Sequence, residues 1–197
     1  MKGLKGIFCA LSVSALCGCI SNAADTATPM PTNLTGIYNG DLDWGDYDND
    51  GDLDILLSGA SASGAITKVY QNVDRSFSED ATVSGQLTNV SEGAANWIDY
   101  NNDGQLDIFI SGNTGSALLS RLYQNSNGSF TAISAGITGI KNGSFNWVDY
   151  DQDGDLDVLI TGDDGTSKIS TLYKNDSGAF TDASAGLTGV HSSDATW

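Results

Sequence analysis

The stretch Asp149-Tyr-Asp-Gln-Asp-Gly-Asp-Leu-Asp157 decides the fold of this chain. Its carboxylates occupy positions 1, 3, 5, 7 and 9 of a nine-residue segment, and Gly154 stands at position 6. Carboxylates packed this closely repel one another, and no cation-rich segment lies nearby in the sequence. A hard dication with flexible oxygen coordination would neutralise them, and Ca²⁺ is the usual one. The stretch therefore predicts a metal-binding loop.

The same nine-residue pattern occurs twice more in the chain. It is complete at Asp46–Asp54 and weaker at Asp99–Asp107, where two of the five carboxylates are replaced by amides. The predicted metal-ligating residues are Asp46, Asp48, Asp50, Asp52 and Asp54 in the first loop, Asp99, Asn101, Asp103, Gln105 and Asp107 in the second, and Asp149, Asp151, Asp153, Asp155 and Asp157 in the third. Side-chain oxygens at positions 1, 3 and 5 converge when the chain turns at the position-6 glycine, which supplies a positive φ. Position 7 is expected to offer its backbone carbonyl and position 9 a further carboxylate. We expect up to three Ca²⁺ sites, with weaker binding in the second loop.

These loops differ from EF-hand loops in their second half. An EF-hand needs a bidentate Glu at position 12 and flanking helices. Position 12 is occupied here by Leu57, Ile110 and Ile160, each within an apolar run typical of a strand. The pattern excludes an EF-hand.

Each acidic segment begins two residues after a tryptophan: Trp44, Trp97 or Trp147. The tryptophans are 53 and 50 residues apart, and a further 50 residues lead to Trp197. A Leu/Ile-Thr-Gly/Asn motif precedes each tryptophan by ten residues and marks the start of each repeat. The predicted repeats are therefore 34–86, 87–136 and 137–186, with a fourth begun at 187–197. The tryptophans are expected to pack between repeats.

Each repeat is predicted to contain four short antiparallel strands. In the third repeat the apolar and β-favouring runs predict strands at 144–148, 156–162, 168–175 and 179–183. Four strands in ~50 residues fit one blade of a β-propeller, whereas a β-sandwich module needs about 100 residues. The fold class is therefore all-β, a β-propeller with three complete blades and the start of a fourth. Because propellers close with roughly 4–8 blades, we expect either further repeats from a longer reading frame or self-assembly through an open blade edge.

The repeats resemble a known family. DxDxDGxxD between two strands, followed by a glycine and a Tyr-x-Asn…Gly-x-Phe-Thr stretch, is similar to the FG-GAP/VCBS repeats, which also form the calcium-binding blades of integrin α propellers. The resemblance covers most of the chain from Leu34 onward and implies that positions 1, 3, 5 and 9 of each loop hold calcium. The FG and GAP words themselves are not evident, so the bacterial VCBS-like branch is the closer match.

The N-terminal segment predicts export. Lys2 and Lys5 precede an apolar run that ends at Gly18 and is too short for a comfortable membrane span, so a signal peptide over 1–23 is expected, with a linker at 24–33. Two processing routes remain open. Signal peptidase can cut after Ser21-Asn-Ala23, or Cys19 can be lipidated as in bacterial lipoproteins. All three cysteines lie in this segment, so the mature domain is expected to have no disulfide. We expect a secreted, periplasmic or cell-surface protein that contacts a membrane only through a lipid on Cys19.

Composition narrows the function classes. The net charge is −17, and 13 of the 25 acidic residues fall in the three loops, which argues against binding nucleic-acid phosphates. The single histidine, His191, is expected to be an exposed strand residue, and no catalytic motif is visible.

We expect a non-catalytic module that binds a protein or glycan ligand. The alternatives are part of a lectin or polysaccharide lyase, or a scaffold whose function lies elsewhere. A lectin would need exposed aromatic residues, but Tyr70, Tyr123 and Tyr173 are expected to lie in the core.

Overall fold

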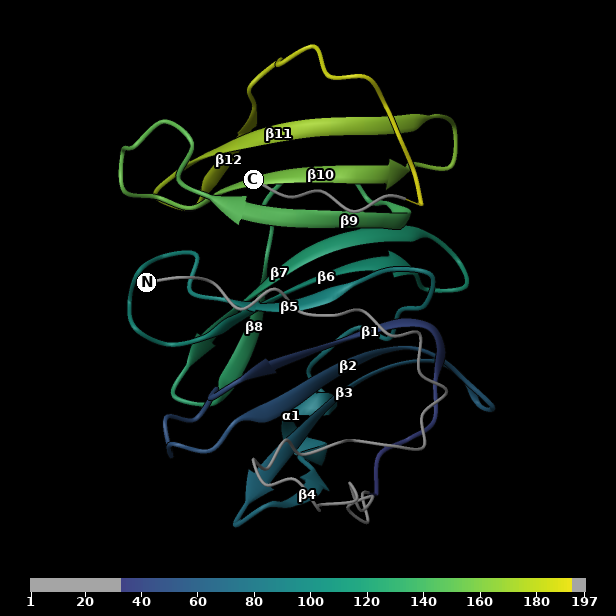
Figure 1. Cartoon of the computed structure of the whole chain (residues 1–197), viewed down its shortest axis with the longest axis vertical. Coiled ribbons are helices and arrows are strands. Elements are labelled where there is room, and N and C mark those ends of the chain that lie inside the picture. Colours follow the sequence, from purple (N-terminus) through teal and green to yellow (C-terminus); the bar gives the residue numbers. More distant parts are fainter. Residues whose placement is uncertain (1–32, 193–197) are drawn as a thin grey trace, which may run out of the picture.

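The computed structural model describes residues 33–192. Three predicted features lie outside the described residues: the signal peptide, the linker except for residue 33, and Trp197. The described chain forms three four-stranded antiparallel sheets, each with its strands in sequence order. Figure 1 shows the sheets stacked one above another along the long axis of the molecule. Each sheet is one blade, so the predicted all-β blade architecture is confirmed.

The strand bounds repeat from blade to blade. Blade 1 contains β1 (Tyr38–Gly45), β2 (Asp54–Ser61), β3 (Gly64–Val73) and β4 (Ser76–Glu79). Blade 2 contains β5 (Ala95–Ile98), β6 (Asp107–Asn113), β7 (Leu118–Ser126) and β8 (Ser129–Ile133). Blade 3 contains β9 (Lys141–Val148), β10 (Asp157–Asp163), β11 (Lys168–Asp176) and β12 (Ala179–Asp182). All four strands predicted for the third repeat are present. The first of them, β9, starts three residues earlier than predicted. It does so because its pairing with β10 continues: Thr161 pairs with Ser144, and Asp163 pairs with Lys141.

One short helix was not predicted. Helix α1 (Ala81–Ser84) follows β4 in the first repeat. The Asp80 side chain caps it by accepting hydrogen bonds from the backbone N–H groups of Thr82 and Val83. Val83 points into the core between blades 1 and 2. No helix in the described part of the chain is long and apolar enough to cross a membrane.

Two clusters of the hydrophobic core lie between neighbouring sheets, and a third lies on the outer face of blade 1, where Ile55 and Tyr70 are covered by Leu34 and Ile37. Successive side chains of a strand point to opposite faces, so the central strand of each blade contributes to two layers. In β6, Ile108 and Ile110 pack toward blade 1, whereas Phe109 packs toward blade 3. The buried tyrosines Tyr70, Tyr123 and Tyr173 were correctly placed in the core, at 1%, 2% and 6% exposure.

Two of the three tryptophans anchor blade interfaces, as predicted. The Trp97 ring stacks on Tyr47 of blade 1 with centroids 5.4 Å apart and an interplanar angle of 3°. Trp147 meets Phe109 of blade 2 edge-on at 5.3 Å. For Trp44 the prediction stays untested, because no described blade precedes blade 1; its ring meets Phe77 of its own blade edge-on at 5.8 Å, and its side chain is 40% exposed.

Candidate metal centres on the acidic loops

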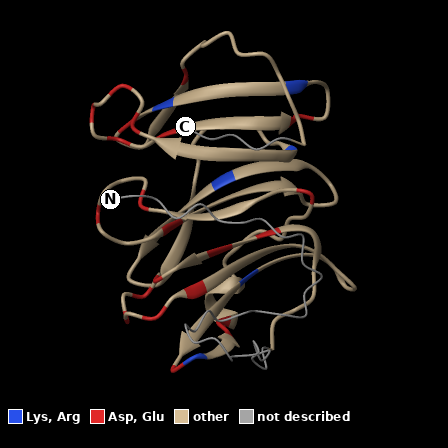
Figure 2. Cartoon of the chain, in the orientation of Figure 1, with Lys and Arg blue, Asp and Glu red and all other residues tan. Residues whose placement is uncertain are grey.

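The three acidic loops occupy equivalent places in the three blades. Each connects the first strand of its blade to the second: β1 to β2, β5 to β6 and β9 to β10. Figure 2 shows that the three loops gather along one edge of the stacked sheets. Loops 2 and 3 touch, because the Asn102 side-chain amide donates a 2.8 Å hydrogen bond to the Gly154 carbonyl.

Loop 1 brings its position-1, -3 and -5 carboxylates together. One carboxylate oxygen from each of Asp46, Asp48 and Asp50 lies within 4.8 Å of the others. The backbone holds this cluster, because the Asp50 N–H donates to Asp46 Oδ1 at 3.0 Å and the Gly51 N–H donates to Asp46 Oδ2 at 3.1 Å. Gly51 has φ of +94°, so the predicted left-handed turn at position 6 is present.

Loop 3 repeats this arrangement. Carboxylate oxygens of Asp149, Asp151 and Asp153 also lie within 4.8 Å of one another. The Asp153 and Gly154 N–H groups both donate to the Asp149 carboxylate at 3.1 Å. Each of these two loops can therefore present three side-chain oxygens to one ion.

Loop 2 keeps the backbone geometry but has fewer charges. The Asp103 and Gly104 N–H groups donate to the Asp99 carboxylate at 3.0 Å. At position 3 the neutral Asn101 side chain donates to Asp103 Oδ2 at 3.0 Å. The loop turns as the others do, with two carboxylates instead of three at positions 1, 3 and 5.

Position 4 also adopts a left-handed conformation, which the sequence analysis missed. Asn49, Asn102 and Gln152 have φ between +56° and +64°. Asparagine tolerates this region better than most non-glycine residues, so the Asn at position 4 of two loops was the available signal. This second left-handed residue lets the carboxylates at positions 1, 3 and 5 face the same point.

The position-9 aspartates are buried completely and bind backbone. Asp54 accepts the Tyr47 N–H at 3.2 Å and, with its other oxygen, the Asn72 N–H at 2.8 Å. Asp157 accepts the Tyr150 N–H at 3.0 Å and the Asn175 N–H at 2.8 Å. Each carboxylate ties the start of its loop to the third strand of the blade. In these two loops both carboxylate oxygens are engaged by backbone N–H groups, and their contact with an ion stays a prediction.

Burial raises the pKa of these carboxyl groups. The pKa rises to about 6 for Asp54 and to about 7 for Asp107, in both cases chiefly because desolvation disfavours the charged form. For Asp157 the pKa is also raised, again mainly by burial. The accepted backbone hydrogen bonds act in the opposite direction. An ion near these groups would favour their charged form.

The position-7 side chains point away from the clusters in two loops. The Gln105 side-chain oxygen accepts the Asn127 N–H at 2.7 Å, and Asp155 accepts the Ser177 N–H at 2.8 Å. Both acceptors steady the turn between the third and fourth strands of their blades. A metal contact at position 7, including Asp52, would use the backbone carbonyl, as the sequence analysis expected.

The asparagine of the Tyr-x-Asn motif closes each loop, a role that sequence reasoning did not assign. Asn125 Nδ2 donates to the Leu106 carbonyl at 3.0 Å and to the Tyr47 carbonyl of blade 1 at 3.3 Å. Asn175 makes the equivalent bonds to Leu156 at 3.0 Å and to Tyr100 of blade 2 at 3.3 Å. These residues join the acidic loops of neighbouring blades. Their recurrence at one repeat position was the available signal.

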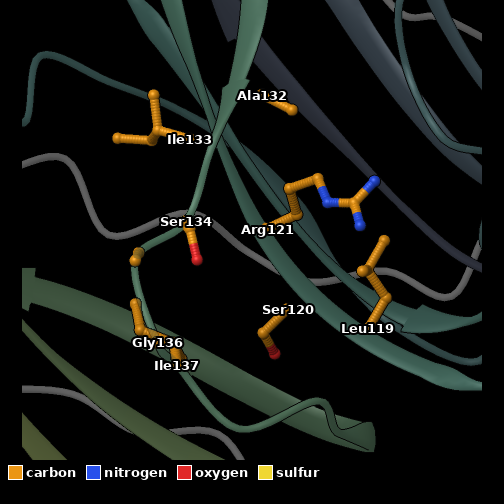
Figure 3. Close-up of a pocket in the computed structure, with 9 residues that line it drawn as sticks. Leu119, Ser120, Arg121, Ala132, Ile133, Ser134, Gly136 and Ile137 are labelled. Atoms are coloured by element: carbon orange, nitrogen blue, oxygen red, sulfur yellow. The ribbon is translucent and has the colours of Figure 1, made fainter.

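Two other features lie away from the loops. An open hollow of about 500 Å³ beside blade 2 is lined by part of β7 and by residues 132–137 (Figure 3). Its one charged residue, Arg121, donates to Thr88 Oγ1 at 3.1 Å. His191 is exposed, as expected, but it lies outside the strands.

Comparison with known proteins agrees with the repeat geometry. No curated protein matches the chain. The model of the FG-GAP-like repeat matches residues 46–110 and 99–160, which together cover more than half of the chain. Each match begins at position 1 of an acidic loop and reaches the second strand of the next blade. The chain belongs to the FG-GAP-like repeat family.

Proposed function

We propose that this protein is an exported, calcium-binding module that recognises a protein or glycan on or outside the cell and has no catalytic activity of its own. The observation that carries the proposal is the repeated carboxylate cluster at one edge of a rigid stack of blades. FG-GAP-like repeats suggest a β-propeller-like binding module, and the clusters add a metal requirement to it.

The donor set fits calcium. Loops 1 and 3 offer only oxygen ligands, and their three clustered carboxylates are exposed or half-buried and open to an arriving ion. Oxygen-only sites select hard cations. Ca²⁺ accepts variable geometry and carboxylate-rich loops, whereas Mg²⁺ demands near-ideal octahedral geometry and keeps several waters. Bound ions would stiffen the loop edge and present it as a fixed surface.

The absence of catalysis is part of the proposal. Carboxylates engaged by an ion would be unavailable as general acids. The single histidine is exposed, and its neighbour in space is the Ser192 hydroxyl at 3.0 Å. We assign it no chemical role.

The recurring tyrosines do not favour the lectin alternative. A platform of stacked sugars needs exposed aromatic rings, but the three tyrosines that recur in the repeats are buried. Their hydroxyls are also engaged, because each bonds Thr35, Thr88 or Thr138 at the start of its own repeat. A glycan ligand would have to bind elsewhere than on these three rings.

The proposal is tested by ligand capture with the full chain. Arrays of glycans and of extracellular proteins are probed in Ca²⁺ and again in EDTA, beside a variant with Asp46→Asn, Asp48→Asn and Asp50→Asn in loop 1. We expect binding in Ca²⁺ that is lost in EDTA and weakened in the variant. Binding that survives complete chelation would contradict a metal-dependent module, and turnover of a captured glycan would contradict the non-catalytic assignment.

Trp44, on the outer face of blade 1, motivates a second proposal about partners. Trp44 occupies the position that Trp97 and Trp147 use to pack on a preceding blade. We propose that this face packs against another repeat, supplied by a second copy or by a longer chain. Sedimentation of the full chain in Ca²⁺ tests self-assembly, and a monomer at all concentrations would exclude it.

A further inference from the structure

Lys174 places a positive charge on the carboxylate cluster of loop 3. It extends from β11, and its ammonium group forms an ion pair with Asp151 and a second one, at 3.0 Å, with Asp153. Asp151 and Asp153 are two of the three clustered carboxylates that would face a metal ion. The ammonium is thus a cation of the chain itself, held where the proposed Ca²⁺ would act.

The other two loops have a neutral residue at this place. The residue lies 23 positions after loop position 3 in every repeat, as the variable residue of the Tyr-x-Asn motif. In blade 1 it is Gln71, whose side-chain amide donates to Asp48 Oδ2 at 2.6 Å. In blade 2 it is Gln124. Loops 1 and 3 therefore have the same five aspartates but differ in the charge of the group that covers position 3.

We propose that Lys174 is a built-in competitor for the third metal site and makes loop 3 bind Ca²⁺ more weakly than loop 1. This inference rests on the proposed calcium binding. To admit the ion, the ammonium must release both carboxylates. It must then stay near a dication, or leave the loop and give up its ion pairs.

How much Lys174 weakens Ca²⁺ binding depends on how exposed its ion pairs with Asp151 and Asp153 are. The Lys174 side chain is 35% exposed, and exposed ion pairs contribute little because water screens them. Repulsion between the lysine and a bound dication adds to the loss of the pair. We therefore expect a difference in Ca²⁺ affinity of about three- to tenfold.

The arrangement changes the expected order of filling. Carboxylate number alone makes loops 1 and 3 equal and loop 2 weaker. With Lys174 included, loop 1 fills first and loop 3 requires a higher Ca²⁺ concentration. Loop 3 would then bind Ca²⁺ over a range of Ca²⁺ concentration in which loop 1 is already saturated.

The experiment reads each loop separately by amide NMR. The Gly51 and Gly154 N–H groups donate to the position-1 carboxylates of loops 1 and 3, so their signals report ion binding to each loop. The full chain is titrated with Ca²⁺ as wild type, as Lys174→Gln and as Gln71→Lys. Lys168→Gln is the matched control, since it removes the same charge from the other end of β11.

We expect the Gly154 midpoint of the wild type to lie above the Gly51 midpoint. Lys174→Gln should lower the Gly154 midpoint about three- to tenfold and leave Gly51 unchanged, whereas Gln71→Lys should raise the Gly51 midpoint. Lys168→Gln should move neither. Coincident wild-type midpoints, an unmoved Gly154 in Lys174→Gln, or an equal shift in Lys168→Gln would overturn the inference while calcium binding stands. If neither glycine responds to Ca²⁺, the proposed function falls as well.

Discussion

The buried aspartate at position 9 does more in this fold than the sequence indicated. Asp54, Asp107 and Asp157 are fully buried, and each accepts a backbone N–H from the third strand. The acidic pattern by itself predicts that they bind the metal, because they complete it. A one-dimensional pattern cannot distinguish a carboxylate that binds an ion from one that binds backbone, because both need a charged oxygen at a fixed place.

Replacing a position-9 aspartate should destabilise the protein even without metal. Asp54→Ala leaves the buried N–H groups of Tyr47 and Asn72 without acceptors, which costs about 2–4 kcal/mol of the free energy of unfolding. Asp52→Ala, two residues away, should cost less than about 0.5 kcal/mol. Denaturant unfolding in EDTA measures both. Equal losses would contradict the structural role of Asp54.

The raised pKa values predict how stability without metal depends on pH. A carboxyl group whose pKa is higher in the folded state stabilises that state when protonated, and this contribution is lost as pH rises through the folded pKa. With folded pKa values of about 6 for Asp54 and about 7 for Asp107, stability in EDTA should fall between about pH 4 and pH 7. Ca²⁺ requires deprotonated carboxylates, so its addition should weaken or reverse the trend. Melting temperatures across this range test the sign, and a flat or rising profile in EDTA would refute it.

At the scale of the element, the repeat made the blade predictable. Because one pattern occurs three times, the sequence was enough to predict the turn glycine, the four strands of each blade and the acidic loop between the first two strands. Helix α1 escaped prediction because it lies between Phe77 and Leu87, a segment that is three residues longer in the first repeat than in the second. The ion pairs of Lys174 escaped because they join residues that lie 21 and 23 positions apart on different elements.

The glycine of the Leu-Thr-Gly motif has a role that depends on its neighbour. A Cβ on Gly139 would come within 2.5 Å of the Leu118 carbonyl oxygen of blade 2, whereas a Cβ on Gly36 would meet nothing within 4 Å. Gly139→Ala should therefore lower the free energy of unfolding by about 1–3 kcal/mol through overpacking. Gly36→Ala, the same change at the same repeat position, should be close to neutral. Similar effects of the two substitutions would show that the contact with the preceding blade is not what requires glycine.

At the scale of the whole molecule, stability comes from the layers between blades. The two interfaces are built from alternate residues of the central strands, the stacked Trp97 and Tyr47 rings, and the asparagines that bond the preceding loop. The sequence predicted tryptophans at interfaces but could not show which interfaces the described chain would form. Trp44 has the same spacing as the others, but it packs on Phe77 of its own blade, because no described blade precedes blade 1.

Replacing Trp97 and Trp44 by alanine tests whether a tryptophan at this repeat position stabilises the protein only where it packs on a preceding blade. Trp97 is 8% exposed and Trp44 is 40% exposed. Trp97→Ala should cost about 3–5 kcal/mol of the free energy of unfolding, as expected for a large buried side chain, and Trp44→Ala less than half as much. Denaturant unfolding of monomeric protein provides the comparison. If Trp44→Ala is as costly as Trp97→Ala, packing against a preceding blade is not what makes the Trp97 side chain important.

The central claim is that the acidic loops bind Ca²⁺ and that the bound ions hold the fold. Thermal unfolding of the full chain in EDTA and in millimolar Ca²⁺ tests it most directly. A ligand that binds only the folded state at 100 times its Kd stabilises by about 2.7 kcal/mol per site, so Ca²⁺ should raise the melting temperature by about 5 °C or more. The triple loop 1 variant Asp46→Asn, Asp48→Asn, Asp50→Asn should lose part of this rise. A melting temperature that is the same in EDTA and in Ca²⁺ would contradict the account.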